Sequence, residues 1–271
     1  MPGVRVVTLN LWNLKSDWEA RMRTAAAGLK ALRPDIVALQ EVVEAPEIGN
    51  QAALLAKILE GELIFDVVDD KSAAGKIGNA IISRHPIKRK ESTLLPGPSD
   101  DPRRALLAEI ELPAGIVPFV SCHLSWEMWH APRREAQVVA LDEFVRSHPA
   151  SLPPIVCGDF NTPPDSAAIY FMTGRMALAG RGTYYRDAWA RRHPHEDGIT
   201  WSDHNPHAVR WIERNRRLDY IFVGQIRPDG WGAILDCRVV MDVPGPDGVY
   251  ASDHFGVYAE LGVSQRMEEA V

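Results

Sequence analysis

The segment Ile155-Val156-Cys157-Gly158-Asp159-Phe160-Asn161 joins a short apolar run to a glycine, a carboxylate and an amide. Apolar runs of this length that end at Gly, Asn or Asp are typical of buried β-strands. Asp159 and Asn161 are two residues apart, so on an extended backbone their side chains point to the same side. The segment therefore predicts a buried strand that carries two polar side chains to one edge of a sheet.

Other short apolar runs, rich in β-branched residues, predict further strands at 4–9, 36–39, 63–68, 80–82, 105–110, 116–120, 218–223, 233–240 and 255–261. Helical spacing separates some of them, at 18–32, 47–59 and 133–145. We expect Pro132 in the first turn of the last of these helices, and Asp165 as the cap of a short helix that begins near Ser166. Strands outnumber helices without strict alternation. This pattern predicts an α/β fold in which two mixed β-sheets pack face to face with helices on both outer sides.

The composition is that of an ordinary globular protein. Of the 271 residues, 46% are hydrophobic and 24% are charged, and no linker or repeat interrupts them. We therefore expect a single domain over residues 1–263 and a C-terminal tail at 264–271. Cys122, Cys157 and Cys237 form no C-x-x-C pair, which fits a reducing compartment. No signal peptide or apolar stretch of membrane-spanning length occurs, so a cytoplasmic location is expected.

The formal net charge of −6 bears on partners rather than on the fold. Tight, sequence-indifferent binding of nucleic acid relies on many Lys and Arg contacts to phosphates. This charge therefore disfavours nucleic acid as a partner without excluding it as a substrate. It also allows a local cluster of carboxylates that a cation would neutralise. No pattern in the sequence indicates an oligomeric state.

Polar residues also stand at the ends of other predicted strands. They are Asn10 after 4–9, Gln40 and Glu41 after 36–39, His123 after 117–122, Asp219 within 218–223, and Asp253 and His254 before 255–261. Because strand ends in a layered fold meet at one rim, we expect these side chains to lie close together. The oxygens of Glu41, Asp253 and Asn10 favour Mg²⁺ or Mn²⁺ over zinc, and Mg²⁺ typically shares its ligand shell with a substrate phosphate.

Such a set of residues is suited to the hydrolysis of a phosphate ester. One of Asp159 and Asn161 can activate a water while the other holds a phosphoryl oxygen. His254 can donate hydrogen bonds to the charge that develops on the phosphate, with Asp219 fixing its orientation. The alternative for Asp219 is a structural ion pair with Arg216 or Arg217, because an unpaired buried carboxylate is costly.

The motifs also occur in a recognisable order: Asn10, Gln40-Glu41, Gly78-Asn79-Ala80-Ile81-Ile82-Ser83-Arg84-His85-Pro86, His123-Leu124, Gly158-Asp159-Phe160-Asn161, Arg217-Leu218-Asp219-Tyr220-Ile221-Phe222 and Ser252-Asp253-His254. In this order the chain resembles the endonuclease/exonuclease/phosphatase superfamily, from Asn10 to His254. The resemblance implies a four-layer α/β sandwich and an Mg²⁺-dependent, in-line attack of water on phosphorus.

By position, the resemblance also implies a role for each residue of the metal and water site. Glu41 matches a metal ligand, Asn10 the amide beside the metal and the phosphate, and Asp253 a residue at the metal site. Asp159 matches the residue that orients or deprotonates the water, and Asn161 matches its phosphate-contacting neighbour.

The resemblance implies two histidines at the scissile phosphate. His254 matches the histidine that stabilises the transition state, with Asp219 as its carboxylate partner. His123 matches a second histidine, which the deoxyribonuclease branch pairs with a glutamate that has no clear counterpart here.

Substrate selection is expected at the rim, where Trp126, Trp129 and Trp201, together with Trp211, predict an aromatic-walled pocket for a base, a ring or a lipid chain. For each tryptophan the alternative is packing against the core. Asn79 is a further candidate for contact with substrate, unless it only satisfies backbone groups beside Gly78.

Two basic pairs and one polar segment carry weaker signals. Arg103-Arg104 and Arg133-Arg134 are candidates for phosphate contact, although arginine pairs are usually solvated. The polar cluster of His193, His195, Glu196, Asp197, Asp203, His204 and His207 matches no metal-binding spacing and predicts a loop beside the catalytic rim.

The sequence thus predicts an Mg²⁺- or Mn²⁺-dependent phosphodiesterase whose substrate is a small organic phosphate, a phospholipid or a nucleic acid. One alternative is an endonuclease of the apurinic or DNA-cleaving type, or an exonuclease. A second is a non-catalytic module that binds metal or phosphate. Such a module is expected to have lost part of the site, but Glu41, Asp159, Asn161, Asp253 and His254 are all present.

Overall fold

The computed structural model describes residues 3–208 and 215–263. The predicted tail at 264–271 and Trp211 lie outside these ranges. The single-domain boundary at residue 263 stays a prediction.

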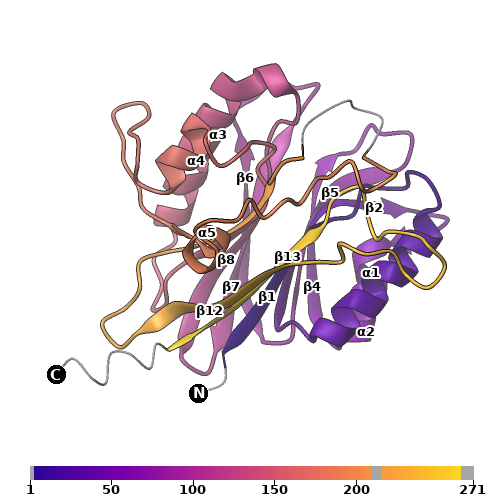
Figure 1. Ribbon diagram of the computed structural model, residues 1–271, viewed down its shortest axis with the longest axis horizontal. Coiled ribbons are helices and arrows are strands. Elements are labelled where there is room, and N and C mark those ends of the chain that lie inside the picture. Colours follow the sequence, from indigo (N-terminus) through magenta and orange to yellow (C-terminus); the bar gives the residue numbers. More distant parts are fainter. Residues whose placement is uncertain (1–2, 209–214, 264–271) are drawn as a thin grey trace.

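Two mixed sheets form the centre of the molecule, as predicted (Figure 1). The first has the order β12–β13–β1–β2–β5–β4, with the short β3 beside β2. Its strands are β1 (Val4–Asn10), β2 (Ile36–Ala45), β3 (Gly49–Asn50), β4 (Glu62–Asp69), β5 (Lys76–Ser83), β12 (Trp231–Val240) and β13 (Gly256–Val263). The second has the order β10–β11–β9–β8–β7–β6. Its strands are β6 (Ile87–Leu95), β7 (Arg103–Leu112), β8 (Gly115–His123), β9 (Ile155–Asp159), β10 (Arg186–Asp187) and β11 (Asp219–Val223).

Helices cover the outer faces of both sheets, so the fold is the predicted four-layer sandwich (Figure 1). They are α1 (Trp18–Leu32) and α2 (Gln51–Leu59) on the first sheet, and α3 (Ala131–Arg146) and α4 (Ala167–Met172) on the second. A 3₁₀ turn, η1 (Met128–His130), precedes α3. Helix α5 (Ala188–Arg192) packs on β11 and β12. Three apolar layers hold the four structural layers together. The middle one joins the two sheets through residues such as Val6, Ile36, Phe119 and Ile221.

Each sheet contains one parallel pair of neighbouring strands, and these two pairs place the polar residues. In the first sheet β1 and β2 run parallel, joined by α1, and Asn10 lies opposite Gln40 at their ends. In the second sheet β8 and β9 run parallel, joined by α3, and His123 lies opposite Asp159. Both pairs deliver their last residues to one edge of the molecule. Crevices at the carboxyl ends of parallel strands are common binding sites in α/β folds.

Helix ends follow local chemistry, with two corrections to the sequence analysis. The side chain of Asn50 accepts a hydrogen bond from the backbone of Ala52, so α2 begins at Gln51 and not at residue 47. Ser166, and not Asp165, caps α4 by accepting from the backbone of Ile169. The end of α1 before Pro34 is as predicted, with Arg33 in the left-handed conformation.

Strand β6 was not predicted from the sequence. It is the edge strand of the second sheet, and its first half, Ile87-Lys88-Arg89-Lys90-Glu91, is dominated by charged side chains. Charged residues on an edge strand prevent pairing with other chains, and they remove the apolar pattern that marks a buried strand.

Within the described residues, no helix has the length and hydropathy needed to cross a membrane.

Candidate active site

The site forms where the ends of the two parallel strand pairs meet. The amide Nδ2 of Asn10, at the end of β1, donates a hydrogen bond of 3.0 Å to Oδ2 of Asp159, at the end of β9. The same amide donates to Oε1 of Glu41 at 3.2 Å. Asn10 therefore joins the two sheets and holds two carboxylates on one side of the pocket. Its own oxygen accepts from the backbone of Trp12 at 2.8 Å.

Glu41 does not lie past the end of a strand, as the sequence suggested, but inside β2. Its φ of 53° is left-handed, and the pairing of β2 with β5 shifts register between Leu39 and Val42. Such a β-bulge interrupts the alternation of side chains and can aim one residue into a site. Nδ2 of Asn13 donates to Oε2 of Glu41 at 2.9 Å. The neighbouring Gln40 is fully buried and donates a hydrogen bond to Ser121, so its role is structural.

Asp159 ends strand β9 and the backbone turns directly after it, so Asn161 does not follow on an extended backbone, which corrects the sequence-based reasoning. Asn161 has a φ of 50°, and Oδ1 of Asp159 accepts a hydrogen bond of 2.9 Å from the backbone N–H of Asn161. Side-chain bonds of this kind stabilise tight turns. Gly158 is required just before, because a Cβ there would collide with the carbonyl oxygen of Cys122 on β8. Asn161 donates from Nδ2 to the carbonyl of Leu124 at 3.1 Å.

His254 and Asp219 form a buried pair. Nδ1 of His254 lies 2.8 Å from Oδ2 of Asp219, while Nε2 lies 3.7 Å from Oδ2 of Asp159. Burial lowers the pKa of His254, but the carboxylates of Asp219 and Asp159 outweigh it and hold this pKa well above its usual value. The alternative partner, Arg217, is instead paired with Asp187 at 2.8 Å. Oδ1 of Asp219 is buried and has no hydrogen-bond partner within residues 3–208 and 215–263.

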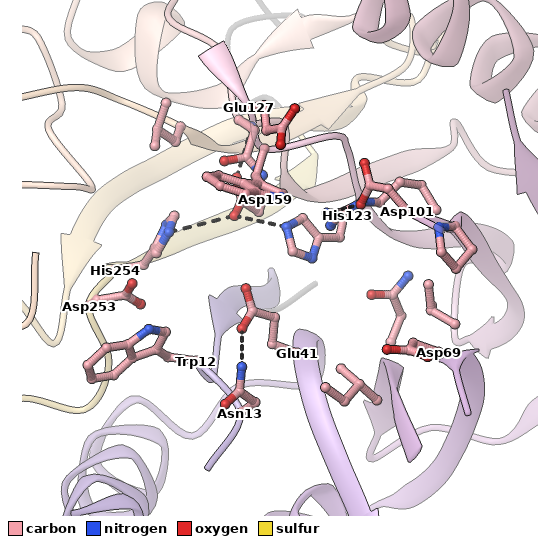
Figure 2. Close-up of a pocket in the computed structure, with 18 of the residues that line it drawn as sticks. Trp12, Asn13, Glu41, Asp69, Asp101, His123, Glu127, Asp159, Asp253 and His254 are labelled. Atoms are coloured by element: carbon pink, nitrogen blue, oxygen red, sulfur yellow. Dashed lines mark hydrogen bonds and ion pairs between the residues drawn. The ribbon is translucent and has the colours of Figure 1, made fainter. Parts of the chain in front are cut away.

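His123 approaches the same carboxylate from the other side. Its Nε2 lies 3.5 Å from Oδ2 of Asp159. Burial, followed by the positive charges of Arg103 and His254, holds the pKa of His123 well below its usual value. Among the described residues, no glutamate pairs with this imidazole. Figure 2 shows Asp159 between the two histidine rings, with Glu41 and Asp253 facing the same space.

The carboxylates of this space fit a hard divalent cation. Burial raises the pKa of Asp253 to about 6, and the charge of Glu41 adds to this effect while His254 opposes it. Burial likewise raises the pKa of Asp159 to about 7. Three anionic groups thus share a buried pocket, and their oxygens are the ligands that Mg²⁺ and Mn²⁺ prefer.

A second grouping is less suited to a cation. Ligand atoms of Asp159, Asp219 and His254 lie within 4.8 Å of one another. The imidazole nitrogen nearest Asp219 is already engaged with that carboxylate. His254 lies between the two carboxylates, with a hydrogen bond to Asp219 and a longer ion-pair contact to Asp159, so this trio is explained without a shared cation.

Arg21 is a site residue that the sequence analysis missed. It is buried on α1 and donates to the carbonyls of Leu11, Trp12, Asn13, Lys15 and Ala251, with distances of 2.6 to 3.3 Å. These carbonyls belong to the loop after β1 and to the segment just before Ser252. Burial lowers the pKa of Arg21 to about 10, against the charges of Asp253, Glu41 and Asp17. Arg21 therefore fixes two active-site loops relative to each other and places a positive charge near the carboxylates.

The rim of the pocket has a different character. The pocket has a volume of about 800 Å³, and Asn79, Trp126, Trp129 and Trp201 all line it. Trp126 and Trp129 are 51% and 74% exposed, whereas Trp201 is 7% exposed and packs with Leu218. Asn79 donates to the carbonyl of Arg104 on β7, a backbone contact in the other sheet and not beside Gly78, and its contact with substrate stays a prediction.

The basic pairs and the polar cluster lie mostly outside the pocket. Arg104 is paired with Asp66, Arg133 with Asp101, and the buried Arg134 donates to backbone carbonyls. Arg103 lines the pocket but is held by Asp101 at 2.7 Å. No member of the polar cluster between His193 and His207 lines the pocket within the described residues.

Comparisons with known proteins agree with this geometry. Residues 7–254 match the Endonuclease/Exonuclease/phosphatase family, whereas no curated protein matches the chain. Among solved structures, TDP2 of D. rerio complexed with a single-strand DNA product is 19% identical, with a TM-score of 0.76 over 96% of this chain and 99% of that one. An endonuclease/exonuclease/phosphatase from Bacteroides vulgatus is 20% identical, with a TM-score of 0.74 over 97% and 100%.

The catalytic domain of human Nocturnin, with a bound sulfate anion, is 19% identical, with a TM-score of 0.71 over 97% of this chain and 95% of that one. At such identities these structures establish the common fold. The family match extends from β1 to His254 and so includes every catalytic and metal-site candidate described above. The chain therefore belongs to the endonuclease/exonuclease/phosphatase family.

Proposed function

We propose that this protein is a divalent-metal-dependent phosphodiesterase that cleaves a P–O bond by in-line attack of water. The observation that carries the proposal is the position of Asp159. Its Oδ2 lies 3.0 Å from the amide of Asn10, 3.5 Å from His123 and 3.7 Å from His254, in a pocket that also holds Glu41. This is a compact acid–base centre beside a site suited to a cation.

Glu41 and Asp253 would hold Mg²⁺ or Mn²⁺, with Asn10 and Asn13 fixing Glu41 through hydrogen bonds. When bound, the cation supplies neutralising charge to the phosphate and polarises its oxygens.

Side chains of the protein carry out proton transfer and stabilise the phosphate. Asp159, with a pKa of about 7, can accept a proton from the attacking water near neutral pH. His254 is protonated at this pH and donates from Nε2 to a non-bridging oxygen, while Asp219 fixes its ring. His123 is neutral, which suits a hydrogen bond to the phosphate better than proton donation to the leaving group. Asn161 has an amide hydrogen left for the phosphate after its bond to Leu124.

The substrate is proposed to be a small organic phosphodiester, a phospholipid or a nucleic acid. The pocket of about 800 Å³ and its exposed tryptophans support a substrate with a ring or an apolar group. Nuclease activity is the second candidate, because the TDP2 structure contains single-strand DNA product. The net charge of −6 counts against it. The three cysteines are free, which supports the expected cytoplasmic location.

The direct test is a substrate screen of the purified protein. Bis-p-nitrophenyl phosphate, p-nitrophenyl phosphate, a phospholipid and abasic DNA are each incubated with Mg²⁺, Mn²⁺ or EDTA. We expect hydrolysis of the diester that requires metal and exceeds hydrolysis of the monoester. Preferred cleavage of DNA, weakened steeply by salt, would support the nuclease. Absence of any hydrolysis together with absence of calorimetric Mg²⁺ or Mn²⁺ binding would leave a module without catalytic function.

A further inference from the structure

Arg216 lines the pocket but has no role in the proposed chemistry. Among the residues that the structure describes, three Lys or Arg side chains line the pocket: Lys15, Arg103 and Arg216. Arg103 gives two hydrogen bonds to Asp101, and Lys15 is exposed to solvent. In the described part of the chain, Arg216 forms no ion pair with any carboxylate, and its Nε is buried without a hydrogen-bond partner.

Arg216 is nevertheless held firmly in place. Its backbone pairs with that of Trp201 through two hydrogen bonds of 2.9 Å, and its guanidinium lies 5.1 Å from the centroid of the Trp201 ring. Trp201 is itself buried, so this stack rests on a fixed surface. An ordered guanidinium loses little freedom when it binds a ligand, and its fork matches the oxygens of a phosphate.

A second arginine lies near Arg216. The guanidinium of buried Arg134 donates to the carbonyls of Ser125, Glu127 and Met128. Arg134 lies close enough to Arg216 and Asp159 for their charges to affect its pKa. The lining of the same pocket also includes the acidic pair of Glu41 and Asp253. A substrate with one phosphate at the metal site thus meets a second, unneutralised positive group within the same pocket.

We propose that Arg216, backed by Trp201, is a subsite for a second phosphate group of the substrate, beyond the phosphate that is cleaved. The inference rests on the proposed function and narrows it to compounds with two separate phosphate groups or a diphosphate. It also explains how a chain with a net charge of −6 can select an anionic substrate: one placed guanidinium does so, without a basic surface.

The test measures binding, so that it does not depend on turnover. Calorimetry with Ca²⁺ in place of Mg²⁺ compares thymidine 5′-monophosphate with thymidine 5′-diphosphate and thymidine 3′,5′-bisphosphate, and fructose 6-phosphate with fructose 1,6-bisphosphate. For at least one pair, we expect the second phosphate to lower Kd roughly tenfold or more, as a charge-assisted hydrogen bond does. In Arg216→Gln the ratio should fall to within about twofold of unity, and Arg216→Lys should keep part of it.

The matched control is Arg238→Gln. Arg238 also lies over an aromatic ring, that of Tyr258 at 4.5 Å, but it is exposed, paired with Asp236 and outside the pocket. This variant should keep the wild-type ratio. The subsite is refuted if no pair shows the preference in the wild type, or if Arg216→Gln keeps it. Failure of the proposed function is seen separately, as absence of phosphodiester hydrolysis while the Arg216-dependent binding preference persists.

Discussion

The buried centre of the site and its aromatic rim are built in opposite ways. Asp159, Asn10 and Asp219 are at most 1% exposed, lie at strand ends and are bound by their neighbours. Trp126 and Trp129 are 51% and 74% exposed and belong to the segment between β8 and α3. Groups that must stay in register for chemistry are placed by sheets, whereas groups that meet the substrate are placed by connections that tolerate change.

This contrast sets the order of the expected effects. A change in the centre removes a group that contacts the reacting atoms. A change in the support behind it moves such groups. A change at the rim alters only which substrate is held.

The largest effect is expected for Asp159→Asn. This change removes the proton acceptor with almost no change in shape, so kcat should fall roughly 10²–10⁴-fold. The assay is hydrolysis of bis-p-nitrophenyl phosphate with Mg²⁺. Asp229→Asn, at an exposed residue paired with Arg227, is the matched control and should keep wild-type activity. Comparable rates in the two variants would remove Asp159 from the mechanism.

The sequence predicts this centre well because strands that end in polar residues leave a local pattern. The order of the motifs and the partnership of His254 with Asp219 follow from such patterns, whereas the parallel pairing of β1 with β2 and of β8 with β9 is seen only in the structure. The bulge at Glu41 does not follow from them either, because its left-handed φ depends on pairing between β2 and β5.

Arg21 is invisible for a different reason. In an Ala- and Arg-rich helix it resembles its solvated neighbours, and only the tertiary fold shows that loop carbonyls surround it. The sequence predicts tryptophans that line the pocket, but not how far each is buried, because irregular segments carry no period. Trp201 is buried while Trp129 is exposed, although both were grouped as pocket aromatics.

Next in size is Arg21→Met. Loss of its bonds to five carbonyls frees the loop after β1, which carries Asn13, and the segment before Asp253, so we expect about 3 kcal/mol or more of lost stability. At temperatures where the variant is folded, Mg²⁺ affinity and kcat should both fall, with KM changed less. Urea unfolding, calorimetry and kinetics measure these effects, and Arg21→Lys should restore part of each. A variant that is unstable but has unaltered Mg²⁺ affinity and kcat would reduce Arg21 to a structural role.

A smaller effect, and a gain of stability where Arg21→Met loses it, is expected for Glu41→Gln in the absence of metal. The folded-state pKa of Asp253 is raised from 3.8 to about 6, so this group costs stability as pH rises through that window. Removal of the charge on Glu41 relieves part of the repulsion, and in EDTA at pH 8 the Tm should rise by roughly 2–4 °C. The gain should shrink at pH 5, and Mg²⁺ should no longer raise the Tm. A large Mg²⁺-induced shift in this variant would contradict the assigned metal site.

The smallest effect on the fold is expected for Trp129→Ala. Its side chain is 74% exposed, so the Tm should stay unchanged, while KM for diesters with an aromatic or lipid group should rise up to about tenfold. Tyr184→Ala removes an exposed aromatic ring away from this pocket and is the control. Equal KM values for aromatic and small diesters in wild type and variant would show that the rim does not select the substrate.

The stereochemistry of hydrolysis tests the central claim most directly. A phosphorothioate diester of known configuration at phosphorus is hydrolysed by the wild-type protein with Mg²⁺ in ¹⁸O-labelled water, and the product is analysed by ³¹P NMR. In-line attack by a water that Asp159 activates predicts inversion at phosphorus, with the label on phosphorus. Retention of configuration, or label in the released alcohol, would contradict the account.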